Sequence, residues 1–333
     1  MKNFSWLLNR HVLGALCATP LLLGSAYTFA DEAAAPAADA APAADAADAA
    51  DAAPAAAPAA AAAPAEPAPP YTLTYNLGVV THYVSRGINN SSGPALQGGV
   101  DWAHSSGFYL GAWASTTNPQ NLGASGSVTN ITPVSLQPLG DGNHVETDWY
   151  GGYSHAFGPV TVGVGGNYVW YPEHEDSYHG NNQDTFEGNI NASAFGFTYT
   201  FYHAFTDWYG IGRTKGGGFT PFAPDLHADT SGAEYHELKY GYTLPIADLN
   251  LAAKVGYQRS SKICLNQKDF SIGLNRNFSL PTGGKPLEGF NAGVAYTGTF
   301  GEEQCSVQSN YYTDDNGEKT NGHLITFFIK RSW

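Results

Sequence analysis

The chain has 333 residues, and its 29 acidic side chains outnumber the 15 basic ones to give a formal net charge of −14 at pH 7. No basic stripe is present to displace counterions from phosphates, which argues against nucleic acid as a partner. One methionine, 20 tyrosines and 39 glycines favour strands joined by tight turns over helices.

Residues 1–30 have the order of charged, apolar and small residues that is typical of a secretory signal peptide. Lys2 and Arg10 precede a mostly apolar stretch that runs from Val12 to Ala26. A membrane anchor is the alternative, but this stretch is short for a spanning helix and Pro20 interrupts it. We predict cleavage after Ala30 and export.

Residues 31–70 consist almost entirely of alanine, proline and aspartate. Frequent prolines prevent a continuous helix, and no large apolar side chain offsets the entropy of ordering the backbone. We predict a disordered periplasmic linker. It acts either as a plain spacer or as an anchor to the cell wall or a partner.

Residues 71–333 alternate between apolar and small or polar side chains. No apolar run after residue 30 is long enough for a membrane helix, so a chain that spans the membrane must do so as a closed barrel. We predict an all-β, antiparallel transmembrane β-barrel of twelve strands, with ten or fourteen as alternatives. The predicted strands are 71–86, 94–104, 107–117, 144–157, 159–173, 184–195, 197–209, 233–244, 248–260, 268–279, 289–301 and 321–333.

The connections between these strands support a membrane barrel over a soluble sandwich. Short turns at one end alternate with generally longer loops at the other, as in outer-membrane barrels, although the connection 280–288 is not short. Aromatic residues near strand ends match the two interfacial girdles. These are Tyr83, Trp102, Trp149, Tyr168 and Trp170. His203 falls on the lipid-facing side, which requires a bulge or a neutral imidazole, and the phase of Phe108 to Ser115 is ambiguous.

The polar face of the strands supplies the predicted pore lining. Its residues are His82, Arg86, Gln97, Asp101, Glu146, Asp148, Tyr150, Glu187, Glu237, Lys239, Lys254 and Lys330. Opposed charges across a lumen select among ions and polar solutes, and the slight excess of acids predicts a weak cation preference. The alternative is that the charges pair and plug the barrel. Tyr150, Tyr171 and Tyr202 could stack on a sugar or nucleobase ring.

Other groups of reactive residues carry weaker signals. Residues 173–176 with His179, and residues 314–317, contain metal-ligand types without a fixed spacing, so we expect no metal and no cofactor. Cys264 and Cys305 lie in neighbouring external loops of an exported protein, which favours a disulfide. No G-x-S-x-G motif occurs, so we do not expect an enzyme, although spacing alone leaves His82 or His203 open as part of a hydrolase site.

Four ordered blocks of sequence resemble the TorF-type porins, the Gcw_chp family. They are 83–87, 93–99, 107–115 and 146–153. The resemblance implies an outer-membrane barrel of the porin type with no established substrate, and it supplies no catalytic residues. Thr81 stands where the family usually has serine, and the loop 118–143 is longer than expected. Arg86, Gln97, Glu146 and Asp148 are the pore-lining positions within the motif, and Arg86 pairing with Glu146 or Asp148 is a structural alternative.

The C-terminal strand resembles the assembly signal that the outer-membrane insertion machinery reads. Its apolar face carries Ile325, Phe327, Ile329 and Trp333. The expected partners are therefore outer-membrane lipid, that machinery, and small polar solutes or ions. We expect a passive diffusion channel in the bacterial outer membrane. A non-conducting surface protein that binds a partner through its loops is the main alternative, followed by a barrel hydrolase.

Overall fold

A computed structural model describes residues 69–91, 93–117, 145–172, 184–209, 231–260, 265–304 and 321–333. The predicted signal peptide, nearly all of the predicted linker, both cysteines of the predicted disulfide and both candidate metal loops lie outside these ranges. Within them, no helix is long and apolar enough to cross a membrane.

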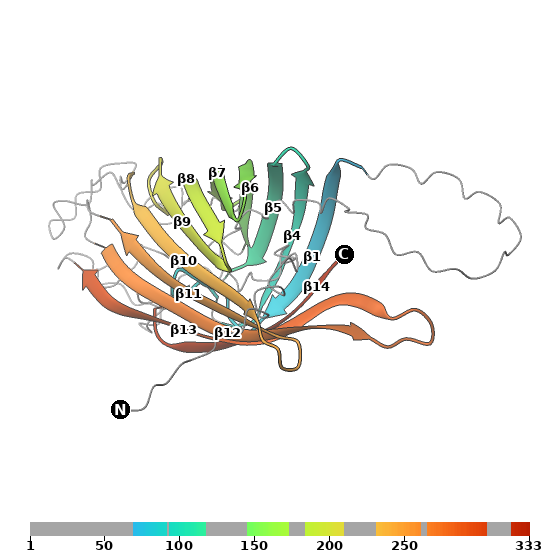
Figure 1. The fold of residues 1–333 in the computed structure, drawn as a ribbon. Helices are drawn as coiled ribbons and strands as arrows, with labels where there is room; N and C mark the ends of the chain where they lie inside the picture. The colour runs from blue at the N-terminus through green and yellow to red at the C-terminus, as the bar shows by residue number, and fades with distance from the viewer. Residues whose placement is uncertain are drawn as a thin grey trace, which may run out of the picture.

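Twelve antiparallel strands form a closed barrel, which confirms the predicted fold class and strand number (Figure 1). Each strand pairs with its neighbour in the chain, and β1 closes the ring against β14. The strands are β1 (Tyr71–Val80), β4 (Ala95–His104), β5 (Phe108–Thr116), β6 (Val145–Phe157), β7 (Val160–Trp170), β8 (Thr185–Ala194), β9 (Phe197–Ala204), β10 (Glu234–Thr243), β11 (Leu249–Arg259), β12 (Leu265–Leu280), β13 (Leu287–Gln304) and β14 (Leu324–Ser332). Closure leaves the ring without an unpaired edge.

The two faces of the barrel invert the pattern of a soluble protein. Large apolar side chains such as Leu77, Val164 and Ile325 are about half exposed on the outer face. Buried polar side chains such as Asn167, Asp269 and Thr326 occupy the inner face. Exposing so much apolar surface to water would be unfavourable. The apolar outer face therefore identifies a transmembrane β-barrel.

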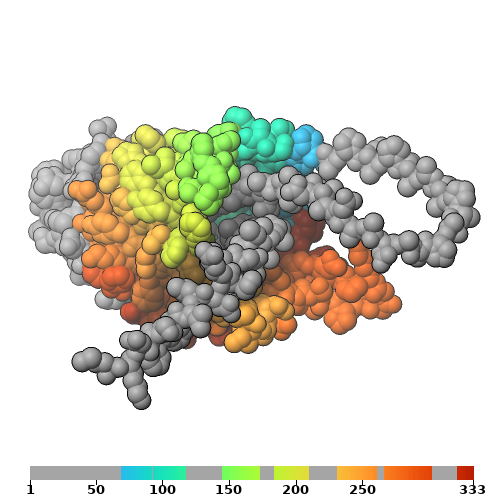
Figure 2. Space-filling view, viewed as in Figure 1, coloured from blue at the N-terminus to red at the C-terminus, as the bar shows by residue number. Residues whose placement is uncertain are grey.

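The barrel has two different ends, which we name the turn end and the loop end. At the turn end the chain reverses at 105–107, 158–159, 195–196, 244–248 and 281–286. The last turn belongs to an extended hairpin of β12 and β13, which projects beyond the barrel wall (Figures 1 and 2). This projection explains the long connection at 280–288, because Leu280 still pairs with Leu287 outside the wall.

The first predicted strand, 71–86, is wrong beyond Val80. The chain leaves the wall there and forms a short hairpin of β2 (Val84–Ser85) and β3 (Ile88–Asn89). Tyr83 is therefore not an outer girdle residue, since only 1% of it is exposed and it packs with Val80 and Ala95 inside the barrel. His82 is half-buried beside it.

The alternation of burial resolves the two uncertain registers. Tyr109 and Ser115 are buried inside β5, whereas Phe108 and Leu110 are exposed on the outer face. His203 lies on the outer face, as predicted, and β9 pairs with β10 through it without an irregularity. Its ring contacts Phe205 edge-on, with 5.1 Å between the ring centroids. No bulge is therefore needed at this position.

Candidate functional site in the barrel lumen

The β2–β3 hairpin turns through two residues, Arg86 and Gly87, whose φ angles are +47° and +80°. Positive φ at both central positions is the geometry of a type I′ turn, which matches the twist of paired strands. Glycine adopts this conformation readily, but for arginine it costs about 1–2 kcal/mol. The surrounding contacts of Arg86 must hold it in place.

The base of the hairpin is fastened to the wall by Tyr83. Its hydroxyl donates a hydrogen bond of 2.5 Å to Glu146 on β6, and its ring lies edge-on to Trp113 at 5.4 Å. Tyr171 donates a second hydrogen bond of 2.5 Å to the other oxygen of Glu146. Burial, together with the charge of Glu146, raises the pKa of Tyr83 and Tyr171 well above their usual range. Both phenols therefore stay protonated as donors to the carboxylate.

The side chain of Arg86, at the tip of the hairpin, binds the wall two strands away from β6. Its Nη2 and Nη1 atoms lie 2.5 Å and 2.9 Å from the two oxygens of Glu187 on β8. The guanidinium also lies 4.5 Å from the ring centroid of Tyr235 and 5.1 Å from that of Tyr202. A bidentate carboxylate and two aromatic faces suit the planar guanidinium better than they would suit lysine.

The backbone of the hairpin tip lies directly against β12 and β13. Gln267 donates a hydrogen bond of 2.7 Å to the carbonyl oxygen of Arg86. A Cβ at Gly87 would lie 2.5 Å from the methyl group of Thr299 and 2.8 Å from the Cβ of Asp269. Glycine is therefore required at position 87 for two reasons, namely its positive φ and the close approach of its backbone to β12 and β13. Together these contacts place the hairpin across the lumen from β6 to β13.

A chain of charges continues along the wall from the hairpin tip. Tyr235 donates hydrogen bonds of 3.0 and 3.2 Å to Asp269. Lys254 lies 3.4 Å from Asp269 and 3.9 Å from Glu237, and Lys239 lies 2.7 Å from Glu237. Because each buried carboxylate has a cation or a phenol beside it, the cost of burying its charge is reduced.

The opposite wall carries a second group of polar residues. Tyr150 donates a short hydrogen bond to Asp101, and Lys330 interacts electrostatically with the same carboxylate. Gln97 donates a hydrogen bond of 3.2 Å to Ser115, and Asp148 is fully buried. Ionisable side chains thus face the lumen from both sides of the barrel.

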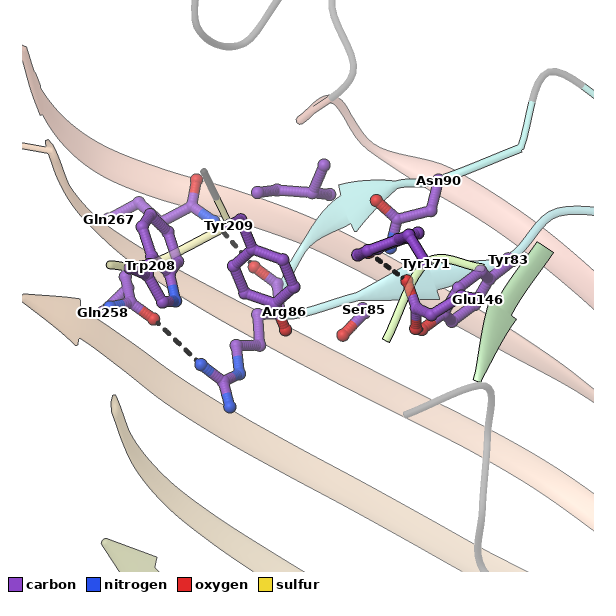
Figure 3. A pocket seen from close by; sticks show the side chains of 11 residues that line it. Tyr83, Ser85, Arg86, Asn90, Glu146, Tyr171, Trp208, Tyr209, Gln258 and Gln267 are labelled. Carbon is purple, nitrogen blue, oxygen red and sulfur yellow. Dashed lines mark hydrogen bonds between the residues drawn. The ribbon is translucent and has the colours of Figure 1, made fainter. Parts of the chain in front are cut away.

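A pocket lies beside the hairpin, and Figure 3 shows the side chains around it. Tyr83, Glu146 and Tyr171 form one group, while Gln258 and Gln267 lie with Trp208 on the other side of Arg86. The full lining is Tyr83, Ser85, Arg86, Ile88, Asn90, Glu146, Tyr171, Trp208, Tyr209, Gln258 and Gln267. The contacts that hold the hairpin therefore also form the walls of this pocket.

The structure brings together several of the residues that were predicted to line a pore. Arg86 forms a bidentate ion pair with Glu187, and the expected alternative, a pair with Glu146 or Asp148, stays a prediction. Glu237, Lys239 and Lys254 form one cluster, and Asp101, Tyr150 and Lys330 form another. His82 makes no side-chain hydrogen bond through Nδ1 to the part of the chain that the structure describes. His203 faces outward, away from any site in the lumen.

The sequence interpretation missed the residues that complete the Arg86 site. These are Tyr83, Tyr235, Gln258, Gln267 and Asp269. Asp269 could have been found, because it alternates with the outward Phe270 and Ile272 on a predicted strand. Tyr83 and Tyr235 could not, since tyrosine near a strand end is equally typical of a side chain that faces lipid.

Comparison with protein-family models gives a match over residues 64–333 to a family described as "Bacterial protein of unknown function (Gcw_chp)". The chain belongs to the Gcw_chp family. This confirms the family resemblance, while the name TorF stays a resemblance. No curated protein matches the sequence of this Gcw_chp chain significantly.

Solved structures similar to this Gcw_chp protein include porins. The KdgM porin is 7% identical, with a TM-score of 0.41 over 78% of this chain and 99% of that chain. A structure titled "KdgM porin in complex with disordered oligogalacturonate" has a TM-score of 0.39 at 7% identity, over 78% and 98% of the two chains. OccK5 (OpdH) of Pseudomonas aeruginosa is 10% identical, with a TM-score of 0.33 over 74% and 60%.

Proposed function

We propose that the protein is an outer-membrane channel for passive diffusion of ions or small polar solutes, with its narrowest part beside the β2–β3 hairpin. Residues 1–30 act as the signal peptide and residues 31–70 as the periplasmic linker. The turn end then faces the periplasm and the loop end faces the exterior.

One observation carries the proposal, namely an ionisable lumen inside a closed barrel whose outer face is apolar. A barrel of twelve strands is wider than the eight-stranded barrels whose side chains fill the interior. Carboxylates outnumber cations in the two lumen clusters and the hairpin site, which supports a weak preference for cations. The carboxylates are Asp101, Glu146, Asp148, Glu187, Glu237 and Asp269, and the cations are Arg86, Lys239, Lys254 and Lys330.

The second candidate function is that of a non-conducting surface protein. The contacts that hold the β2–β3 hairpin inside the lumen favour it. Tyr83 holds the base of the hairpin on β6, and Gln267 on β12 binds the backbone of its tip, so the hairpin spans the lumen. If this arrangement closes the barrel, the protein acts through its external loops. A hydrolase is a weaker candidate, because His203 lies on the outer face rather than in the lumen.

Planar-bilayer recording of the refolded full chain tests the proposal. Stepwise currents from the wild-type protein are expected, with a reversal potential in a KCl gradient that indicates weak cation preference. Asp101→Asn and Lys330→Gln form a matched pair, since they remove opposite charges from one cluster. They should shift the reversal potential in opposite directions.

Three outcomes of the recording contradict the channel. Absence of steps from wild-type protein, with steps from Arg86→Gln, assigns the hairpin as a plug. If neither the wild-type protein nor Arg86→Gln gives stepwise currents, the result supports a non-conducting surface protein. Hydrolysis of ester or peptide substrates by the same sample, without current, supports the enzyme.

A further inference from the structure

Within the described ranges, the outward-facing cations are confined to one sector of the barrel. Among the described residues, every lysine or arginine on the outer surface lies on β11, β12 or β14 or in the turn after β12. They are Arg259, Lys268, Arg276, Lys285 and Arg331. The outward positions of β1 and β4 to β10 carry neither residue type in the described part of these strands. An apolar outer wall can form without cations, so their one-sided distribution points to a role other than building the wall.

Two of these cations lie toward the loop end of the sector. Lys268 stands in a row of outward residues that crosses five strands, from Phe201 through His236 and Tyr257 to Lys268 and Phe300. The ring of His236 lies 5.0 Å from that of Phe201 and 6.3 Å from that of Tyr257. An outward row of aromatic rings near strand ends marks the level of the membrane interface. Lys268 is thus placed at headgroup depth.

Arg259 lies on the strand next to Lys268 and nearer to the loop end. Tyr257 pairs with Lys268, so Arg259 is two residues beyond that pair along β11. Its side chain is 56% exposed, and its Nη1 lies 3.7 Å from an oxygen of Glu234. Glu234 partly offsets the charge of Arg259, while Lys268 is flanked in register by Tyr257 and Phe300. We name Arg259 and Lys268 the outer cation pair.

We propose that the outer cation pair binds the phosphate of an anionic glycolipid headgroup in the outer leaflet. Phosphate is the anion available at headgroup depth, and arginine with lysine is the side-chain chemistry that holds it. Residues 71–333 carry 22 acidic and 13 basic side chains, a net charge of −9 that repels an anionic surface, so a local cluster is needed to hold such a lipid. The proposal rests on the membrane orientation given under Proposed function and is independent of conduction.

Native mass spectrometry of the full chain from mixed micelles tests the site. Purified lipid A and its dephosphorylated form serve as probes. The double variant Arg259→Gln/Lys268→Gln should retain about tenfold less lipid A than the wild-type protein. The matched control Arg276→Gln/Arg331→Gln removes two outward cations at the turn end and should retain lipid A as the wild-type protein does. Heat-modifiable migration in gels checks that each variant is folded.

Each other result overturns the site. Equal retention by the double variant and the wild-type protein, an equal loss in the turn-end control, or equal binding of dephosphorylated lipid A would do so. Displacement of lipid A by excess inorganic phosphate would assign a free-phosphate site instead. Bilayer conductance of the same samples separates the two proposals, because a failed channel leaves the difference in lipid retention intact.

Discussion

Arg86 and Glu187 are 101 residues apart in the chain, and they form a bidentate ion pair across the barrel lumen, with 2.5 Å from Nη2 to Oε2 and 2.9 Å from Nη1 to Oε1. Both side chains are almost fully buried. The pair holds the tip of the β2–β3 hairpin together with the hydrogen bond from Gln267 to the carbonyl oxygen of Arg86. Its strength therefore sets how firmly the hairpin occupies the lumen.

Arg86→Gln should release the hairpin tip. Removing one partner of a buried pair typically costs about 3–5 kcal/mol, because the other charge stays buried without compensation. We expect a lower free energy of unfolding in urea and a larger or noisier single-channel current. The double variant Arg86→Gln/Glu187→Gln should recover part of the lost stability. Unchanged current and stability in Arg86→Gln would show that the pair does not hold the hairpin.

Gly87→Ala should destabilise the same hairpin through its backbone. A residue with a Cβ at φ +80° carries a cost of about 1–2 kcal/mol. The new methyl group would also press on Thr299 and Asp269. Gly93→Ala is the control, since a Cβ there meets nothing within 4 Å. Urea unfolding of both variants in micelles should separate them, and equal stabilities would contradict the close approach of the tip to the wall.

Trp333→Ala should slow barrel assembly. Trp333 exchanges backbone hydrogen bonds of 2.9 and 3.0 Å with Tyr75, and their rings stack at 6.4 Å between centroids, so this residue takes part in closing β14 on β1. We expect a lower yield of folded protein after refolding into vesicles. Phe195→Ala removes an aromatic side chain that is 81% exposed in a turn, and it should leave the yield unchanged. Similar yields of folded protein for the two variants would contradict a specific role of Trp333 in barrel assembly.

The disulfide between Cys264 and Cys305 stays a prediction, because both residues lie outside the described ranges. β12 begins at Leu265 and β13 ends at Gln304, and Leu265 pairs with Gln304 in register. In the sequence, Cys264 directly precedes this paired position and Cys305 directly follows it. Alkylation of the denatured, unreduced mature protein, which lacks Cys17 of the predicted signal peptide, should label neither thiol, whereas the reduced mature protein should take up two labels. Labelling of both thiols without reduction would refute the pairing.

The alternation of the sequence predicted the wall of the barrel well. A strand with one face in lipid and the other in the lumen needs apolar and polar residues at period two, so β8 and β11 could be located from side-chain order alone. The outward position of His203 and the outward face of Ile325, Phe327 and Ile329 follow from the same constraint. These properties are local, and each can be read within one strand.

The hairpin was decided only by the tertiary structure. His82, Tyr83 and Arg86 continue the alternation of β1 whereas Val84 and Ser85 break it, so the pattern alone does not separate a wall strand from a strand folded into the lumen. The choice depends on Glu146, Glu187 and Gln267, which lie far along the chain and contact the hairpin in the closed barrel. The sequence by itself therefore determined a twelve-stranded barrel with an ionisable lumen. Long-range ion pairs and aromatic contacts decided what occupies that lumen, because such contacts have no period in the sequence.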